Sequence, residues 1–307
     1  MRSRGRVDAP VAALIINNCY KLQIMYYYFL NNKYLVTTDT ISENTHFKHE
    51  WSSPVDIACK LIEVNVSDIA ASGGLPRVAF LNLGLSRFSE KNNWLKPFLK
   101  QLHNKLLQYK IQLEGGDTYF SDKTNLTLTL IGETKKPILR HTGSKNDLVY
   151  MTGSIGLSLL GYKLLADNIQ LPLSLKKEAL HKHLQPSSKL EMAKHLTRKY
   201  KISAMMDITD GLIQDSGKLA LASNLRMDIE IEKIPRLAEL QAYLTLDDIL
   251  SSGEELELLF LSKEKIKSTK NFPVSCIGKA TLGLPKVYFT LDGKSYKPQK
   301  KGFLHFQ

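Results

Sequence analysis

Apolar and polar positions in the first half of the chain switch between a two-residue period and a helical period. Residues 34–37 are expected to form a strand that ends at Thr38-Asp39. Ser53-Pro54, a cap residue with proline at the first helical position, predicts a helix whose apolar positions keep helical spacing as far as residue 69. Gly73-Gly74 is expected to end this helix. Further elements are expected at residues 78–85 (strand), 94–109 (helix) and 126–132 (half-exposed strand).

A segment rich in Lys, Pro, Gly and Ser at residues 135–146 is the best candidate for a linker between two units. After it, apolar runs predict further strands with helices between them, one of the helices at residues 211–223. The pattern predicts an α/β (α+β) protein of two domains, residues 1–138 and 139–307. The strands of the second unit are expected at residues 148–152, 202–206, 227–231, 256–261, 274–277 and 287–291.

The composition is that of a soluble globular protein, with 43% hydrophobic and 23% charged residues. No apolar run approaches the ~18 residues of a membrane span, and the short run at residues 11–16 breaks at Asn17-Asn18 without a clear cleavage site. Cys19, Cys59 and Cys276 match no zinc spacing and suit a reducing compartment. We therefore expect a cytoplasmic protein without a membrane partner.

The net charge of +12 is compatible with nucleic-acid binding. The lysines are scattered through helical segments such as residues 176–182 and 263–270, however, and no basic run is interleaved with aromatic residues. The charge is expected to favour solubility or to attract small anionic substrates. No nucleic-acid partner is expected.

Carboxylates on four short polar segments are the main candidates for chemistry. Asp207 and Asp210 lie where a buried strand runs into a helix, and a helix N-terminus favours phosphate. Taken alone, this pair is also compatible with an ordinary aspartate cap. Asp39, Asp68 and Asp117 lie on three further segments that are expected to be turns. Since Mg²⁺ prefers oxygen ligands and commonly bridges carboxylates to phosphates, the set predicts a multi-metal, phosphate-handling centre.

Other nucleotide-binding and catalytic patterns are missing from the sequence. It has no Gly-x-x-x-x-Gly-Lys-Ser/Thr loop, no Gly-x-Gly-x-x-Gly and no serine in a nucleophile elbow. The motifs that it has, taken in order, resemble those of thiamine-monophosphate kinase over nearly nine-tenths of the chain. They are Thr37-Thr38-Asp39-Thr40, Asn44-Thr45-His46-Phe47, residues 64–77, Gly115-Gly116-Asp117-Thr118, Arg140, residues 206–212, residues 253–258 and residues 302–306.

The resemblance implies a fold and an activity. The fold would be that of aminoimidazole ribonucleotide synthetase, with two α/β domains and N-terminal sheets that pair across a homodimer. The N-terminal domain would bind ATP and Mg²⁺ and form the dimer. The enzyme would pass the γ-phosphate of ATP directly to thiamine monophosphate, giving thiamine diphosphate, by positioning and metal-assisted charge neutralisation rather than through a covalent catalytic residue.

The resemblance also implies the roles of individual residues. Gly116, Asp117, Arg140 and Thr209 would contact ATP, and His46, Glu254 and Phe303 would contact thiamine monophosphate. Read alone, Asp210 could be only a helix cap, His46 an ordinary surface or core histidine, and Phe303 a packing residue. The implied magnesium ligands are Thr37, Thr38, Asp39, Asp68, Asp117, Asp207 and Asp210.

Two features depart from the family pattern and leave alternatives open. Glu255 and Leu256 stand where the family usually has Asp-Tyr, and the Gly-Asp-Asp-Ala-Ala turn that opens the family has no clear copy, Val7-Asp8-Ala9 being the nearest match. One alternative is selenophosphate synthetase, although Cys19 lacks the expected Gly-rich setting, or aminoimidazole ribonucleotide synthetase. The other is a nucleotide-binding protein whose catalysis is weakened by the missing turn.

Overall fold

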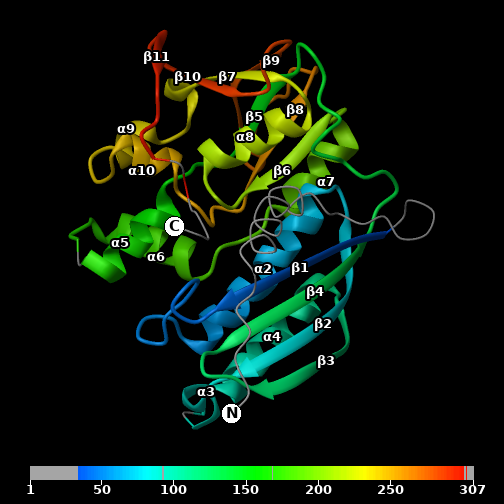
Figure 1. The fold of residues 1–307 in the computed structure, drawn as a ribbon, viewed down its shortest axis with the longest axis vertical. Coiled ribbons are helices and arrows are strands. Elements are labelled where there is room, and N and C mark those ends of the chain that lie inside the picture. The colour runs from blue at the N-terminus through cyan, green and yellow to red at the C-terminus, as the bar shows by residue number, and fades with distance from the viewer. Residues whose placement is uncertain (1–33, 92, 168, 301, 303–307) are drawn as a thin grey trace, which may run out of the picture.

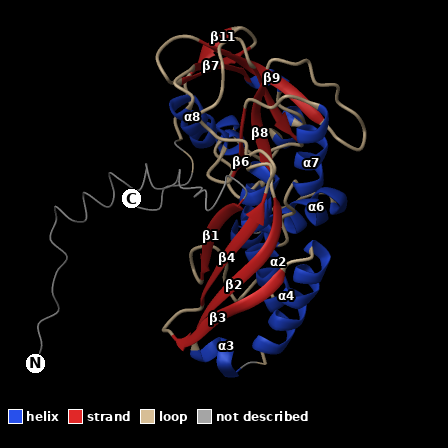
Figure 2. Cartoon of the chain, turned by 90° about the vertical axis from the view of Figure 1, so that its right-hand side faces the viewer, coloured by secondary structure: helices blue, strands red, loops and turns tan. Residues whose placement is uncertain are grey.

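The computed structural model describes residues 34–91, 93–167, 169–300 and 302. The N-terminal unit contains a four-stranded sheet in the order β1-β4-β2-β3, in which β2 and β3 are parallel and the other pairs antiparallel. Its helices lie on one side of this sheet (Figure 2). The elements are β1 (Tyr34–Ser42), α2 (Pro54–Ala71), β2 (Leu75–Leu85), α3 (Arg87–Lys91), α4 (Leu95–Tyr109), β3 (Gln112–Phe120) and β4 (Asn125–Glu133).

The C-terminal unit contains a seven-stranded mixed sheet in the order β11-β10-β7-β9-β5-β8-β6 (Figure 1). Its strands are β5 (Leu148–Thr152), β6 (Ala204–Ile208), β7 (Arg226–Glu230), β8 (Glu257–Ser262), β9 (Val274–Thr281), β10 (Val287–Leu291) and β11 (Lys294–Tyr296). Its helices are α5 (Leu157–Asp167), α6 (Leu173–Leu184), α7 (Leu190–Lys199), α8 (Leu212–Ala222), α9 (Leu237–Leu240) and α10 (Leu246–Leu250), with a 3-10 turn η1 (Ile231–Lys233).

Helix α2 lies between the two sheets and is buried on almost every side. It begins with a reciprocal capping box between Ser53 and Asp56, and it ends where the Gly74 N–H bonds the Ile69 carbonyl across Gly73, which has a φ of +73°. Polar residues of the helix such as Lys60, Glu63 and Ser67 are buried together with its apolar ones, so the whole helix lies in the core rather than on a surface. The start and end predicted for this helix are therefore confirmed.

The hydrophobic core has two layers because successive side chains of a strand point to opposite faces. Met205 of β6 joins the layer that contains α2 and the N-terminal sheet, whereas Met206 joins the layer beneath α8. The first layer therefore spans both units, and polar residues on α2 can meet residues of β6 directly. The boundary predicted between residues 138 and 139 falls in the connection from β4 to β5 and stays a prediction.

None of the three segments expected to be turns is one: residues 65–68 lie within α2, and the other two are parts of strands. β1 continues through Thr38-Asp39 to Ser42, and Gly115-Gly116-Asp117 lie within β3. β1 is held by a nine-residue antiparallel ladder with β4, and paired threonines such as Thr40 and Thr127, whose hydroxyl oxygens are 2.7 Å apart, line its outer side. The prediction that Asp39 and Asp117 lie on turns was wrong because long-range strand pairing outweighs local turn signals.

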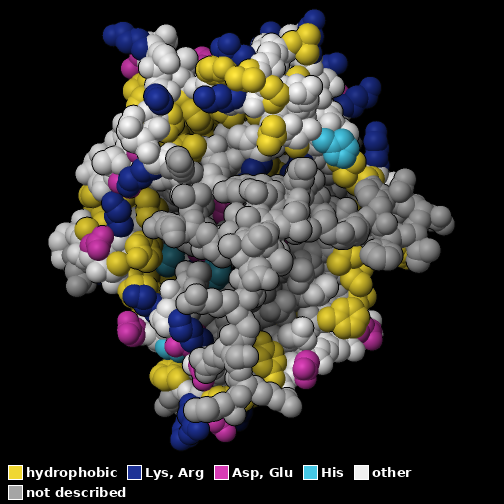
Figure 3. All heavy atoms as spheres, in the orientation of Figure 1, with side chains coloured by type: hydrophobic (Ala, Val, Ile, Leu, Met, Phe, Trp, Pro, Cys, Tyr) yellow, Lys and Arg dark blue, Asp and Glu magenta, His cyan; other side chains and the backbone are white. Residues whose placement is uncertain are grey.

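Among the described residues, no helix is long and apolar enough to cross a membrane. On the face shown in Figure 3, the Lys and Arg side chains of the described residues are dispersed over the upper and lower parts instead of forming one patch. This agrees with the scatter of basic positions along the sequence.

Candidate active site

Three of the predicted acids meet where α2 lies against both sheets. Asp39 is on the α2-facing side of β1, Asp68 is in the last turns of α2, and Asp207 is buried on β6. The Thr37 hydroxyl donates to Asp68 Oδ2 at 2.5 Å. The Ser67 hydroxyl donates to Asp207 Oδ2 at 2.6 Å. Two adjacent residues of the helix therefore bond β1 of one sheet and β6 of the other.

In the acid cluster (Asp39, Asp68, Asp207 and Asp210), burial and the neighbouring carboxylates favour the protonated form of two members, Asp39 and Asp207. Burial, and then the charge of Asp68, raise the pKa of Asp207 to about 7, against the smaller opposing effects of Ser67 and Arg140. Burial, and then the charges of Asp207 and Asp210, raise the pKa of Asp39 to about 6. Carboxyls that resist ionisation in a metal-free site are the groups that a bound cation would stabilise in their charged form.

The turn after β6, at Thr209 and Asp210, is held in place by another buried acid, Asp215. Asp215, in the first turn of α8, accepts the backbone N–H groups of Thr209 and Asp210, both at 2.9 Å. Lys218 of the same helix pairs with Asp215 at 2.9 Å and also with Asp210. Burial raises the pKa of Asp215 to about 6, although Lys218 opposes this. The Asp210 carboxylate is thus fixed at the N-terminal end of α8.

Thr38 and Asp117 lie on the other face of the N-terminal sheet. The Thr38 hydroxyl is 3.0 Å from that of Thr129 on the exposed side. The register of the four strands aligns Asp117 of β3 with Thr40 of β1. Because Thr40 follows Asp39 directly on β1, the side chains of Thr40 and Asp117 point to the face of the sheet opposite Asp39. β1 and β3 are also opposite edges of the sheet, about 14 Å apart at ~4.8 Å per strand. One chain therefore does not bring these two residues to the acid cluster, and their role as magnesium ligands stays a prediction.

His46 and Glu254, predicted to contact the substrate, lie on either side of a buried lysine. Lys60 of α2 donates to Glu254 Oε2 at 2.7 Å and to the His46 carbonyl at 3.2 Å. The Ser42 N–H donates to His46 Nδ1 at 3.1 Å, which puts the proton of a neutral His46 ring on Nε2. The Glu254 N–H bonds the Thr209 carbonyl at 2.8 Å. This substrate cluster (His46, Lys60 and Glu254) therefore lies beside the turn that carries Asp210.

The acid cluster has the donor chemistry of a magnesium site. Its side chains offer only carboxylate oxygens, with hydroxyls beside them, the hard ligands that Mg²⁺ prefers. In the described part of the chain, no group of three or more His, Cys, Asp or Glu side chains is arranged to hold one metal ion. The carboxylates instead have protein partners: Thr37 for Asp68, Ser67 for Asp207 and Lys218 for Asp210.

Comparisons with known proteins show similarity over most of the chain. The models of the AIR synthase related protein match at residues 25–134 for the N-terminal domain and at residues 144–268 for the C-terminal domain. A thiamine-monophosphate kinase from Leptospira interrogans is 50% identical over 274 residues, 89% of each chain. The chain belongs to the thiamine-monophosphate kinase family.

More distant members of the family agree in sequence and in fold. The thiamine-monophosphate kinase of Aquifex aeolicus is 31% identical over 284 residues, covering 91% of this chain and 90% of that one. A solved structure, AaThiL complexed with AMPPCP and TMP, matches with a TM-score of 0.83 at 28% identity and covers 99% of this chain and 100% of that one. The two-domain fold expected from the resemblance is confirmed.

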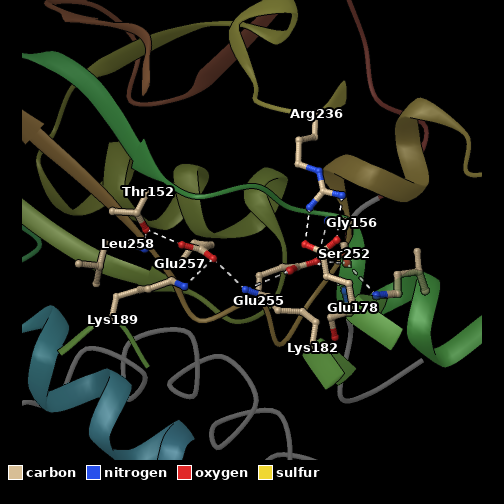
Figure 4. Close-up of polar contacts among 12 residues, drawn as sticks. Thr152, Gly156, Glu178, Lys182, Lys189, Arg236, Ser252, Glu255, Glu257 and Leu258 are labelled. Carbon is tan, nitrogen blue, oxygen red and sulfur yellow. Dashed lines mark hydrogen bonds and ion pairs between the residues drawn. The ribbon is translucent and has the colours of Figure 1, made fainter. Parts of the chain in front are cut away.

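Glu255, a departure from the thiamine-monophosphate kinase pattern, points away from the substrate cluster. It accepts the Gly156 N–H at 2.6 Å and the Ser252 hydroxyl at 2.6 Å, at the start of α5 (Figure 4). Burial raises its pKa, against the neighbouring Lys182 ammonium. Lys182 lies between Glu255 at 3.7 Å and Glu257 at 2.8 Å. In this chain the Glu255 carboxylate therefore holds the start of α5 through Gly156, Ser158 and Ser252.

Some predicted residues lie outside the described part, and some residues of the site were not predicted. Phe303, Asp8 and Cys19 lie outside the described residues. Gly302, just before Phe303, lies so close to the Asp210 turn that a Cβ added to it would be 2.5 Å from the Asp210 carbonyl oxygen. The residues that sequence reasoning did not assign are Lys60, Ser67, Asp215 and Lys218. A lysine inside an apolar helix was the one available signal among them.

Gly116 is required by the close approach of β3 to β2. It has a φ of +152°, and a Cβ added there would lie 1.7 Å from the Leu81 carbonyl oxygen. Gly116→Ala is expected to lower the free energy of unfolding by at least about 2 kcal/mol, measured by urea denaturation. The matched control is Gly217→Ala in α8, where no atom lies within 4 Å of the added Cβ. The control should change stability by no more than about 1 kcal/mol, in the stabilising direction. Equal effects of the two substitutions would contradict this account of Gly116.

Proposed function

We propose that this chain transfers the γ-phosphate of ATP to thiamine monophosphate, giving thiamine diphosphate and ADP. The observation that carries the proposal is the 50% identity to a thiamine-monophosphate kinase over 89% of both chains. The geometry supports it, because an oxygen-rich acid cluster suited to nucleotide phosphates lies beside a separate polar cluster that can orient a second substrate. The comparisons do not favour the alternatives, selenophosphate synthetase and aminoimidazole ribonucleotide synthetase, over this kinase.

The proposed ATP side of the site is built on the acid cluster. Asp39, Asp68, Asp207 and Asp210, with Thr37, would hold Mg²⁺, and Arg140, Thr209 and Gly116 would contact the nucleotide. Magnesium usually binds through one or two carboxylates together with water and substrate phosphates, so no closed cage of protein ligands is needed. When bound, it would neutralise charge on the β- and γ-phosphates. The protein's own contribution is positioning, because Asp215 fixes the backbone of Thr209 and Asp210.

The proposed acceptor side is the substrate cluster. The His46 Nε2–H would donate to thiamine monophosphate and the Glu254 carboxylate would accept from it, while Phe303 would pack against one of its aromatic rings. The Thr209 carbonyl, which the Glu254 N–H bonds, connects this side to the ATP side. In-line transfer requires the acceptor phosphate to meet the γ-phosphate with little freedom.

The proposal is tested by measuring ADP release with ATP and Mg²⁺, first without an acceptor and then with thiamine monophosphate or with selenide. We expect release that depends on both Mg²⁺ and thiamine monophosphate. Equal release with and without thiamine monophosphate would favour a nucleotide-binding protein of weakened catalysis. Release stimulated by selenide alone would favour selenophosphate synthesis.

We also propose a homodimer that forms through the N-terminal sheet. All nine residues of β3, an edge strand, are exposed, and Phe80, Leu113, Tyr119 and Phe120 are each at least 40% exposed. An open edge with apolar side chains is a liability that pairing removes. The proposed domain division remains residues 1–138 and 139–307. The cytoplasm, where ATP is available, is the proposed location, and neither a nucleic-acid nor a membrane partner is proposed.

The dimer is expected to appear as twice the chain mass of 34.7 kDa in light scattering at micromolar concentration. Phe120→Lys, which places a charge on the exposed edge, is expected to shift the mass toward the monomer. Phe88→Lys serves as the control, because Phe88 is also exposed (45%) but lies on α3, outside the sheet. A monomeric mass for the wild-type chain would contradict the proposal.

A further inference from the structure

Lys60 is a charged residue in the middle of α2, a helix that is buried on almost every side. It is 3% exposed, and its neighbours Cys59 and Leu61 are core residues. A buried ammonium is costly unless its charge and its N–H donors are matched. Lys60 meets this requirement through Glu254 Oε2 at 2.7 Å and the His46 carbonyl at 3.2 Å.

The two acceptors of Lys60 belong to different units. His46 lies in the loop between β1 and α2, and Glu254 lies between α10 and β8, 194 residues from Lys60 in sequence. Both are already constrained locally: His46 by the Ser42 N–H, and Glu254 by a backbone φ of +53° and its bond to the Thr209 carbonyl. Lys60 therefore joins His46 and Glu254, each already held by its own loop, across the junction of the two units.

The charges around this contact make Lys60 the cation that balances Glu254. Burial alone would raise the pKa of Glu254, but Lys60 and His183 outweigh it, and the pKa lies below its ordinary value. Burial, and then the charge of Lys60, lower the pKa of His183 to about 4, so His183 is neutral near pH 7. Glu254 is thus an ionised acceptor whose partner is a single buried ammonium.

We propose that Lys60 is a positioning residue that fixes Glu254 and the His46 loop as one binding surface for thiamine monophosphate. This inference rests on the proposed function and on the substrate roles proposed for His46 and Glu254. Lys60 acts through these two residues. Its removal should therefore weaken the binding of the acceptor while it leaves the acid cluster and the binding of ATP intact.

The test is the steady-state kinetics of Lys60→Met, a substitution of similar length without charge. The KM for thiamine monophosphate is expected to rise at least about tenfold, the usual consequence of losing a charged hydrogen bond, while the KM for ATP changes less than about threefold. In a Glu254→Gln background, Lys60→Met should add less than about a twofold further change, because its main partner has gone. The control is Lys105→Met, which breaks a comparable ion pair between α4 and α2, with Glu63 at 2.6 Å. It should leave both KM values unchanged.

The outcomes separate this inference from the proposed function. A wild-type enzyme without ADP release dependent on thiamine monophosphate would overturn the proposed function itself. If the wild type is active, equal rises in both KM values, an unchanged KM for thiamine monophosphate, or the same effect in Lys105→Met would overturn only the role of Lys60. If Lys60→Met does not fold, Lys60→Arg replaces it, since a guanidinium cannot reproduce both contacts. A selective rise in the KM for thiamine monophosphate in that variant supports the role, and no rise overturns it.

Discussion

Asp207→Asn is expected to lower the rate of phosphoryl transfer by about 10³-fold, the scale of losing a principal electrostatic group in a water-poor site. Asp207 is 1% exposed and lies against Ser67 and the charge of Asp68, where it would hold a cation beside the transferred phosphate. Asparagine keeps the shape and one oxygen but removes the charge. The measurement is kcat at saturating ATP, Mg²⁺ and thiamine monophosphate, with folding checked by circular dichroism.

The matched control is Asp228→Asn on β7 of the same sheet. Asp228 pairs with Arg226 at 2.7 Å at the surface, and its loss should leave kcat within about twofold. Alanine at Asp39 or Asp68 is expected to reduce kcat as Asp207→Asn does, because these carboxylates share the cluster. Near-normal activity in two of these three cluster variants would remove the basis for a magnesium site here.

The second large effect is on the stability of the metal-free protein. The pKa of Asp207 is about 7 in the folded protein and 3.8 in the unfolded chain, so between these pH values the folded state holds a proton that the unfolded state has lost. The free energy of unfolding therefore falls as pH rises through this window, and Asp207 contributes a loss on the order of 4 kcal/mol by pH 8. Asp39, with a pKa of about 6, adds a loss in the same direction.

Asp207→Asn should abolish the Asp207 part of this loss, since asparagine does not ionise. In chelator-treated protein, urea denaturation is expected to show the variant more stable than the wild type by about 1.6 kcal/mol at pH 5 and by about 4 kcal/mol at pH 8, so the difference widens as pH rises. Asp228→Asn should not change the pH dependence of the wild type. Parallel curves for wild type and Asp207→Asn from pH 5 to pH 8 would show that the Asp207 carboxyl is not held in a charge-repelling site.

Local signals in the sequence were sufficient for helices such as α2. Its serine cap, first-turn proline, apolar spacing and terminal glycines all lie within the helix or beside it, so the predicted start and end were confirmed. β1 and β3 were different, because their threonines and glycines also favour turns. Their true extent depends on pairing with β4 and β2, which no local window contains.

The same limit applies to the site. Motif order predicted Asp39, Asp68 and Asp207, which the structure brings together, but it gave no information on which face of a strand each residue occupies. Thr38 and Asp117 were grouped with them although their side chains point away from the acid cluster. The contact of Lys60 with Glu254 joins residues 194 positions apart, so only the packing of α2 against both units reveals it.

Transfer of phosphate from ATP to thiamine monophosphate can be tested by following the phosphate itself. The enzyme is incubated with Mg²⁺, thiamine monophosphate and ATP labelled in the γ-phosphate, and the products are separated by chromatography. We expect the label to appear in thiamine diphosphate in proportion to the ADP formed, and we expect omission of Mg²⁺ to abolish transfer. Label recovered only as inorganic phosphate, or thiamine diphosphate formed without label, would contradict it.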